Sequence, residues 1–146
     1  MKVAYPTIFT ETETNILIEI PDLGILTETN SEDGEARNLT DAVAMARDAI
    51  GLHCISREDN EETVACSSRI QDIDISTSTF YKDGKTFVSI VDVDLMMYRR
   101  KNDMKMVRRN VTLPNWLNRE AEEAHINVSR VLQEALMNKL NISKVF

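Results

Sequence analysis

The segment from Met106 to Leu140 constrains the fold of this chain most strongly. It opens with polar and apolar residues that alternate from Arg108 to Leu113, and a period of two predicts a short strand with two different faces. Pro114 follows at a place that suits the first position of a helix, where the missing amide proton costs nothing. The segment therefore predicts a strand followed directly by helical structure.

Two amphipathic helices are expected after this strand. Leu117, Ala121 and Ala124 recur at spacings of four and three, which places them on one face of the first helix. Asn127 offers a side-chain oxygen that can cap a second helix. The second helix carries a wide apolar stripe of Val128, Val131, Leu132, Ala135, Leu136 and Leu140. A unit this small buries too little surface alone, so the stripe predicts a partner.

The order of one strand and two helices resembles the ribbon-helix-helix family of DNA-binding proteins. The resemblance implies that two copies pair their strands into a ribbon that enters the major groove of operator DNA. It implies base contacts from Arg108, Asn110 and Thr112, whose side chains suit guanine, adenine and thymine. Taken alone, an alternating strand of this kind is more often a solvated edge strand.

The same resemblance implies a phosphate contact and a dimer core. Ser129 and Arg130 stand at the start of the second helix, where the phosphate would bind. Val128 occupies a position at which family members often carry a basic residue. The implied dimer core consists of Val111, Leu113, Leu117, Val131, Leu132, Ala135 and Leu136.

The charge of the chain is divided unevenly along its length. Residues 1–103 hold 20 acidic and 10 basic residues, a net charge of −10, whereas residues 104–146 hold 4 and 7, a net charge of +3. The division favours DNA binding by the C-terminal part and a basic partner for the front. The alternative is that the acidic surface serves only solubility.

Two cysteines make no disulfide framework, so we expect Cys54 and Cys66 to be small buried hydrophobes in a reducing compartment. The N-terminus lacks an apolar run long enough for a signal peptide, and no later segment is long and apolar enough to span a bilayer. These features predict a cytoplasmic protein.

The front of the chain predicts a small α+β layer in the order β-β-β-α-β. The expected strands are Lys2–Phe9, Asn15–Ile20, Ile25–Thr29 and Thr86–Val93, with Tyr5-Pro6 indicating an edge strand or a bulge. Asn38 or Thr40 can cap a helix whose apolar positions are Leu39, Val43, Ala46, Ile50 and Cys54. Arg57–Thr63 is expected to be a loop and Leu95–Arg100 a brief helix. The predicted division is a domain over 1–100, a linker over 101–105 and a domain over 106–146.

Several short motifs of the front occur in an order that resembles the HicB antitoxin family. They are Tyr5-Pro6-Thr7-Ile8-Phe9, Ile20-Pro21-Asp22-Leu23, the Ala-rich helix of Asp41–Ile55, and Val91-Asp92-Val93-Asp94. The resemblance implies a truncated ribonuclease-H-like domain followed by a ribbon-helix-helix. Many members have Pro-Gly after Pro-Asp-Leu, where this chain has Gly24-Ile25.

The function that this resemblance implies has two parts. The front domain would neutralise HicA, a small basic toxin that cuts mRNA, and the C-terminal domain would repress the operon as a homodimer. An acidic antitoxin can compete with RNA for a basic toxin surface. The sequence does not single out the contacting carboxylates; Glu11, Glu13, Glu28, Glu32, Asp33 and Glu35 cluster at predicted strand ends and loops.

Two other readings remain open at this point. A metal-dependent nuclease would need several carboxylates, which Glu19, Asp22, Asp92 and Asp94 could supply. A free-standing transcriptional regulator would use the front domain to sense a small ligand, although the chain has no glycine-rich phosphate loop. His53 and His125 each stand alone on an expected helix, away from ligand spacing. We expect no catalytic residue, metal or cofactor.

Overall fold

The computed structural model describes residues 1–29, 38–103 and 105–142. The chain divides into two compact units, Met1–Lys105, called here the front unit, and Met106–Phe146, called the tail unit. The candidate acids Glu32, Asp33 and Glu35 lie outside the described residues.

A four-stranded antiparallel sheet forms the centre of the front unit, in the order β3-β2-β1-β4. The strands are β1 (Lys2–Glu11), β2 (Ile16–Ile20), β3 (Ile25–Glu28) and β4 (Lys85–Asp94). The first and last strands in sequence are neighbours along their whole length, from Lys2 opposite Asp94 to Glu11 opposite Lys85. The α+β class and the β-β-β-α-β order of the front are therefore confirmed.

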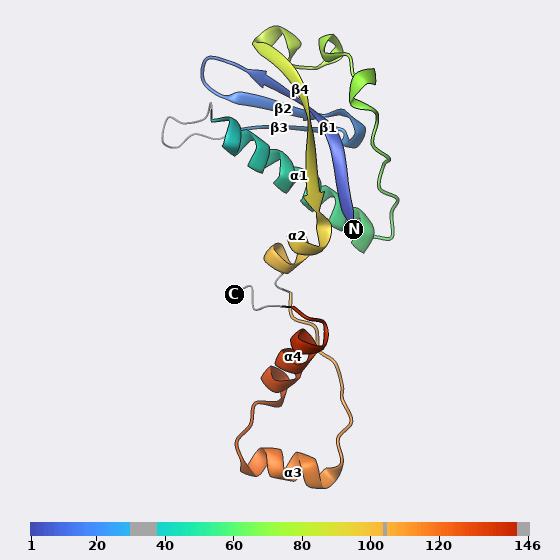
Figure 1. Ribbon diagram of the computed structural model, residues 1–146, viewed down its shortest axis with the longest axis vertical. Helices are drawn as coiled ribbons and strands as arrows, with labels where there is room; N and C mark the ends of the chain where they lie inside the picture. Colours follow the sequence, from blue (N-terminus) through green and yellow to red (C-terminus); the bar gives the residue numbers. More distant parts are fainter. Residues whose placement is uncertain (30–37, 104, 143–146) are drawn as a thin grey trace. The chain divides into compact units, whose positions relative to one another are not determined.

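Helix α1 (Leu39–Asp59) covers one face of this sheet (Figure 1). The Asn38 side chain caps its start by accepting the amide of Thr40 at 2.9 Å. The buried residues are Ala42, Ala46, Ile50, Gly51 and Cys54, mostly four apart, as a single row facing the sheet requires. The prediction that Leu39 belongs to this row was wrong, because the row begins at Ala42 and Leu39 is half exposed. The predicted loop from Arg57 also starts too early, since α1 continues to Asp59.

The opposite face of the sheet is covered in part by the irregular segment between α1 and β4. This segment contains three short 3-10 turns, η2 (Ile70–Asp72), η3 (Ile75–Thr77) and η4 (Tyr81–Asp83), and η1 (Pro21–Leu23) lies between β2 and β3. Glu19 points to this face, away from Ile18 and Ile20, and accepts the hydroxyl of Ser78 at 2.6 Å. Because both faces are covered, β1 is buried continuously from Tyr5 to Thr10.

Pro6 does not mark an edge strand or a bulge as predicted. It lies in β1, which pairs with β4 on one side and with β2 on the other. The β2 ladder, however, reaches only from Glu11 to Ile8, and it stops before Pro6. The missing amide proton of Pro6 therefore removes no ladder hydrogen bond, which is the condition under which a sheet tolerates proline.

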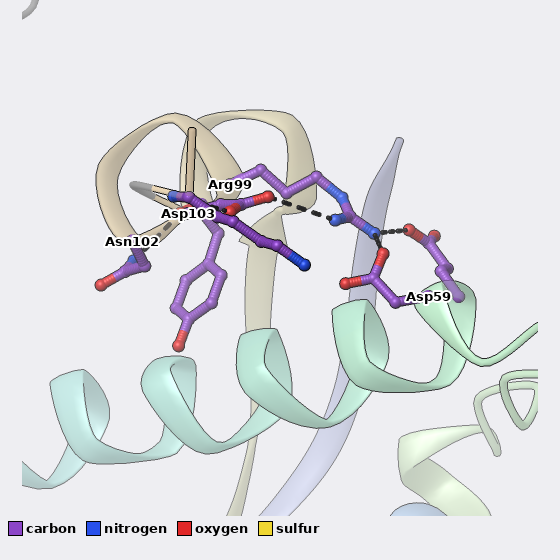
Figure 2. A network of polar contacts seen from close by, with 7 residues as sticks. Asp59, Arg99, Asn102 and Asp103 are labelled. Atoms are coloured by element: carbon purple, nitrogen blue, oxygen red, sulfur yellow. Dashed lines mark hydrogen bonds and ion pairs between the residues drawn. The ribbon is translucent and has the colours of Figure 1, made fainter. Parts of the chain in front are cut away.

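Helix α2 (Leu95–Asn102) follows β4 directly and packs on α1. Asp94 caps it by accepting the amides of Met96 and Met97. Tyr98 lies over Gly51 so closely that a Cβ there would come within 2.5 Å of the ring. Arg99 donates to Glu58 and Asp59 at the end of α1, both at 2.9 Å (Figure 2). The helix runs two residues beyond the predicted end at Arg100, into the expected linker.

The tail unit consists of α3 (Asn115–Glu123), α4 (Val128–Lys139) and the segment that precedes them. The expected strand Arg108–Leu113 is not formed in this single chain, because a strand needs a partner for its ladder and the described tail supplies none. Pro114 is the residue before α3 rather than its first helical residue; its carbonyl accepts the amide of Asn118. None of the described residues of this unit is buried.

Candidate functional site

The predicted base-reading side chains lie together in the segment that precedes α3. Every residue from Val107 to Pro114 is exposed, and the segment adopts neither helix nor strand. In the described part of the chain, the side chains of Arg108, Asn110 and Thr112 make no hydrogen bond or ion pair. Three polar groups with base-edge chemistry are thus presented to solvent within five residues.

The start of α4 is capped as the sequence predicted. The Asn127 side chain accepts the amide of Arg130 at 3.1 Å, and the Asn127 carbonyl accepts the amide of Val131. Ser129 is exposed at this end, while the Arg130 guanidinium donates to Glu134 at 3.4 Å along the helix. The cap uses the amide of Arg130, so the amides of Val128 and Ser129 remain for a phosphate, with the exposed Ser129 hydroxyl beside them.

The residues assigned to a dimer core lie exposed in the single chain. Val111, Val131 and Leu136 are about half exposed, Leu113 and Leu117 slightly less, and Leu132 is partly covered. Val111, Leu113 and Val128 line one hollow of about 420 Å³, together with Asn115 and Asn118 at the start of α3. The structure therefore brings apolar residues from the predicted strand and the second helix to one open hollow.

Both tail helices end in a turn that sequence reasoning missed. The amide of Ile126 donates to Ala121, that of His125 donates to Glu122, and His125 has a φ of 55°. Asn141 repeats this geometry after α4, also with a φ of 55°. These are Schellman turns, which usually place glycine at the left-handed position. His125 thus lies just after a helix, not on it, and the turn between α3 and α4 depends on its backbone.

The four carboxylates that a metal-dependent nuclease would need each bind a different part of the fold. Glu19 accepts from Ser78 and Thr79. Asp22 accepts the amide and hydroxyl of Ser68, at 2.8 and 2.6 Å. Asp94 caps α2, and Asp92 accepts from Arg47. Among the described residues, no three His, Cys, Asp or Glu side chains are placed to share a metal ion.

The outer edge of β4 carries a contact that the sequence did not signal. Arg47 of α1 donates to the carbonyl and to the carboxylate of Asp92, both at 3.2 Å. The two residues are 45 positions apart, and Arg47 looks from the sequence like any exposed helical cation. The pair closes the C-terminal end of that edge and leaves its N-terminal part open.

An open hollow of about 480 Å³ lies between β3 and α1. Its lining combines apolar side chains with polar ones: Ile25, Leu26, Thr27, Ala49, Leu52, His53, Ser56, Arg57 and Glu62. At one end Arg57 and Glu62 form an ion pair at 3.2 Å. His53 therefore lies beside a hollow, and in the described residues it belongs to no group of three or more side chains that could hold a metal ion.

The two cysteines differ in exposure. Cys54 is buried against Tyr5, and burial raises the pKa of its thiol. Burial, together with the neighbouring Cys54, also raises the pKa of Tyr5 to about 12. The prediction that Cys66 is buried was wrong, because it lies in the irregular segment after α1 and is exposed. The hydroxyl of Tyr5 donates to the carbonyl of Ala65, the residue before Cys66, at 2.6 Å. This hydrogen bond anchors the backbone beside Cys66, whose thiol is exposed.

Comparison with known proteins gives one likeness of fold. No protein-family model matches the chain, and no curated protein matches it. A solved chain described as "Toxin-Antitoxin complex from Streptococcus pneumoniae" is similar over 95% of this chain and 99% of its own length, with 21% identity and a TM-score of 0.58. The two chains thus share a fold that extends over both units. No helix in the described ranges is long and apolar enough to cross a membrane.

Proposed function

We propose that this protein is an antitoxin of the HicB type, which neutralises a HicA-like, mRNA-cleaving toxin through its front unit and represses its own operon through its tail. The observation that carries the proposal is the likeness of fold to a chain of a toxin–antitoxin complex, which spans nearly the whole of both chains. The motif order of the front, and in the tail an alternating segment followed by the helices α3 and α4, support the same family.

Unpaired backbone and exposed apolar side chains in the tail support the proposal that it forms a ribbon-helix-helix dimer. Among the described residues, its segment 107–114 pairs with no strand and none of its apolar side chains is buried. Two copies would supply both at once, by pairing the segments as antiparallel strands and covering the hollow lined by Val111, Leu113 and Val128. In such a ribbon Arg108, Asn110 and Thr112 share the face away from the core and reach base edges. Two-fold protein symmetry then requires an inverted repeat in the operator.

DNA reading can be tested with two adjacent arginines that carry equal charge. Arg108→Ala removes a predicted base contact and should cost about 1–3 kcal/mol in operator binding. Arg109→Ala removes the same charge from the opposite strand face and is the matched control. Binding of both variants to operator and to scrambled DNA at fixed salt separates base reading from phosphate attraction. Equal losses on both sequences for both variants would remove Arg108 from the reading face.

Neutralisation is tested with the full chain and the product of the adjacent small reading frame. We expect RNA cleavage by that product to stop at a near-equal molar ratio, because an acidic front unit competes with RNA for a basic surface. Arg108→Ala should neutralise as well as the unaltered chain. Unimpeded cleavage by a folded chain that still binds the operator would instead favour a free-standing regulator. In that case the hollow between β3 and α1 is the place to look for a small ligand.

The proposed role is not enzymatic. Glu19, Asp22 and Asp94 each bind backbone amides or hydroxyls of the fold itself, which gives these carboxylates a structural use. A test is RNA and DNA hydrolysis by the chain alone with Mg²⁺ or Mn²⁺. The informative variant is Asp92→Asn, because among the described residues the Asp92 side chain makes only the contact with Arg47. Nucleic-acid cleavage by the unaltered chain that disappears in this variant would contradict the proposal.

A further inference from the structure

The unpaired edge of β4 is the longest open strand edge in the described front unit. β4 has ten residues and only β1 beside it, whereas the other edge strand, β3, has four. No proline or glycine interrupts β4. Figure 1 shows α1 running beside the sheet, and among the described strands only β1 pairs with β4. Natural proteins rarely leave such an edge without protection.

Two hydrogen bonds show which backbone groups of β4 point outward. The amide of Leu95 donates to the carbonyl of Met1, the residue before β1. Backbone groups alternate in direction along a strand, so the residues of β4 that lie two, four, six, eight or ten positions before Leu95 form hydrogen bonds with β1. The carbonyl of Asp92 accepts from Arg47 of α1, so it points away from β1. Both observations give the same alternation. The amides and carbonyls of Thr86, Val88 and Ile90 therefore face the open edge.

Partly exposed apolar side chains alternate along this edge with the polar Lys85, Thr86 and Ser89. Ile90 is 46% and Phe87 39% exposed, and Val88 is half-buried. Phe87 stacks on Phe9 with ring centroids 5.4 Å apart. The edge thus combines unpaired backbone groups with the partly exposed side chains of Phe87 and Ile90, and both features favour the addition of another strand.

We propose that a second copy of this chain pairs with this edge, β4 against β4, in an antiparallel arrangement centred on Val88. The argument for a second copy is self-complementarity. With Val88 opposite its counterpart, Thr86 faces Ile90 and Phe87 faces Ser89 of the other copy, and Lys85 faces Val91. No like charges face each other within Lys85–Val91. Arg47 occupies the carbonyl of Asp92, which ends the pairing at the same place in both copies.

Such pairing joins two four-stranded sheets into one continuous sheet and involves only the front unit. It is independent of the tail association proposed above, so a chain that also pairs through its tail would assemble beyond a dimer. The interface is isologous, since the same residues meet on both sides of the two-fold axis.

The test measures the mass of the full chain by sedimentation, with Ile90→Lys as the variant. A lysine on the edge should raise the dissociation constant of this step at least about tenfold, because charged edge residues block strand addition. Leu52→Lys is the matched control, since Leu52 is 58% exposed on α1 and the change adds the same charge. Leu132→Asp, in the tail, tests the proposed tail dimer separately. Equal masses for Ile90→Lys, Leu52→Lys and the unaltered chain would overturn the proposal.

Amide exchange keeps the proposal falsifiable even if a variant folds poorly. In the unaltered chain, the amides of Thr86, Val88 and Ile90 should exchange slowly at high protein concentration and quickly on dilution. The amides of Phe87, Ser89 and Val91, which bond to β1, should stay protected at both concentrations. Outward amides that exchange quickly at every concentration, and become protected only when the toxin is added, would assign this edge to the toxin instead.

Discussion

The two units of this chain differ in how much apolar surface each buries within a single copy. The front unit buries a continuous core between sheet and α1, with Phe9, Ile18, Ile20 and Ile50 at 0–1% exposure. The tail unit has two helices, α3 and α4, and no buried residue among those described. The first is a fold in the usual sense, whereas the second leaves its apolar residues without a buried core, as the proposed pairing with a second copy requires. The difference suits a protein that would present one surface to a toxin and a paired surface to DNA.

The largest effect should follow from opening the front core. Phe9→Ala removes a fully buried ring that stacks on Phe87, and we expect a loss of about 3–5 kcal/mol in the free energy of unfolding of the front unit. The chain's tyrosines, Tyr5, Tyr81 and Tyr98, all lie in the front and its single tryptophan, Trp116, in the tail. Denaturation followed by tyrosine fluorescence reports the front unit, and denaturation followed by tryptophan fluorescence reports the tail unit. An equal shift of the Trp116 transition would show that the two units unfold together.

The corresponding change in the tail should act on association rather than on folding of one copy. Leu132→Asp places a carboxylate in the proposed dimer core, and we expect the dissociation constant to rise about 100-fold or more. Sedimentation measures it, and the tyrosine-reported transition of the front should stay unchanged. Gln133→Asp, at the neighbouring exposed position, adds the same charge outside the stripe. If Leu132→Asp left the mass unaltered, the stripe on α4 would not be the dimer core.

A third change sharpens the comparison inside the front unit. Gly51→Ala brings a methyl group against the Tyr98 ring, and the displacement of α2 should cost about 1–3 kcal/mol. Ala44→Ser, on the exposed face of the same helix, is expected to cost less than about 0.5 kcal/mol. The cost of Gly51→Ala should shrink in a Tyr98→Ala background, because the clash is with that ring. A cost that is the same in both backgrounds would place its origin elsewhere.

Gly51 also illustrates what the sequence could not reveal. The helix, the four strands and the cap at Asn38 follow from local pattern, because spacing and capping act between neighbours in sequence. The contact of Gly51 with Tyr98, and that of Arg47 with Asp92, join residues more than 40 positions apart and depend on how elements pack. The misplaced burial of Cys66 has the same cause, since composition does not say which irregular segment covers a core.

The tail shows a different limit. Its helices and the cap at Asn127 were predicted closely, while the strand Arg108–Leu113 is not formed in one copy. The alternation of that segment predicts a strand only if a second strand lies beside it, and a single copy contains none. The predicted roles of Arg108, Asn110, Thr112, Ser129 and Arg130 therefore stay predictions that depend on a partner chain and on DNA.

Alkaline pH should destabilise the front unit. Burial, with the hydrogen bond to Asp48, raises the pKa of Tyr98 from 10.0 to about 12, so the folded front unit favours the neutral phenol. A raised folded pKa gives stability that is complete below pH 10 and is lost as the pH rises towards 12. Tyr98→Phe should flatten this loss, leaving the part due to Tyr5. The midpoint of denaturation between pH 8 and 11 measures it; an identical slope in the variant would exclude Tyr98 as a cause.

The smallest expected effect compares the same turn in both units. Glu61, after α1, and His125, after α3, have φ values of 58° and 55° in Schellman turns. Left-handed backbone strains a residue with a Cβ, so Glu61→Gly and His125→Gly should each stabilise their turn by about 0.5–1 kcal/mol. In the front this gain should appear as a higher denaturation midpoint. In the tail it should appear mainly as tighter association, since we propose that a second copy stabilises α3 and α4. A gain in the tail that does not vary with protein concentration would show that α3 and α4 fold without a second copy.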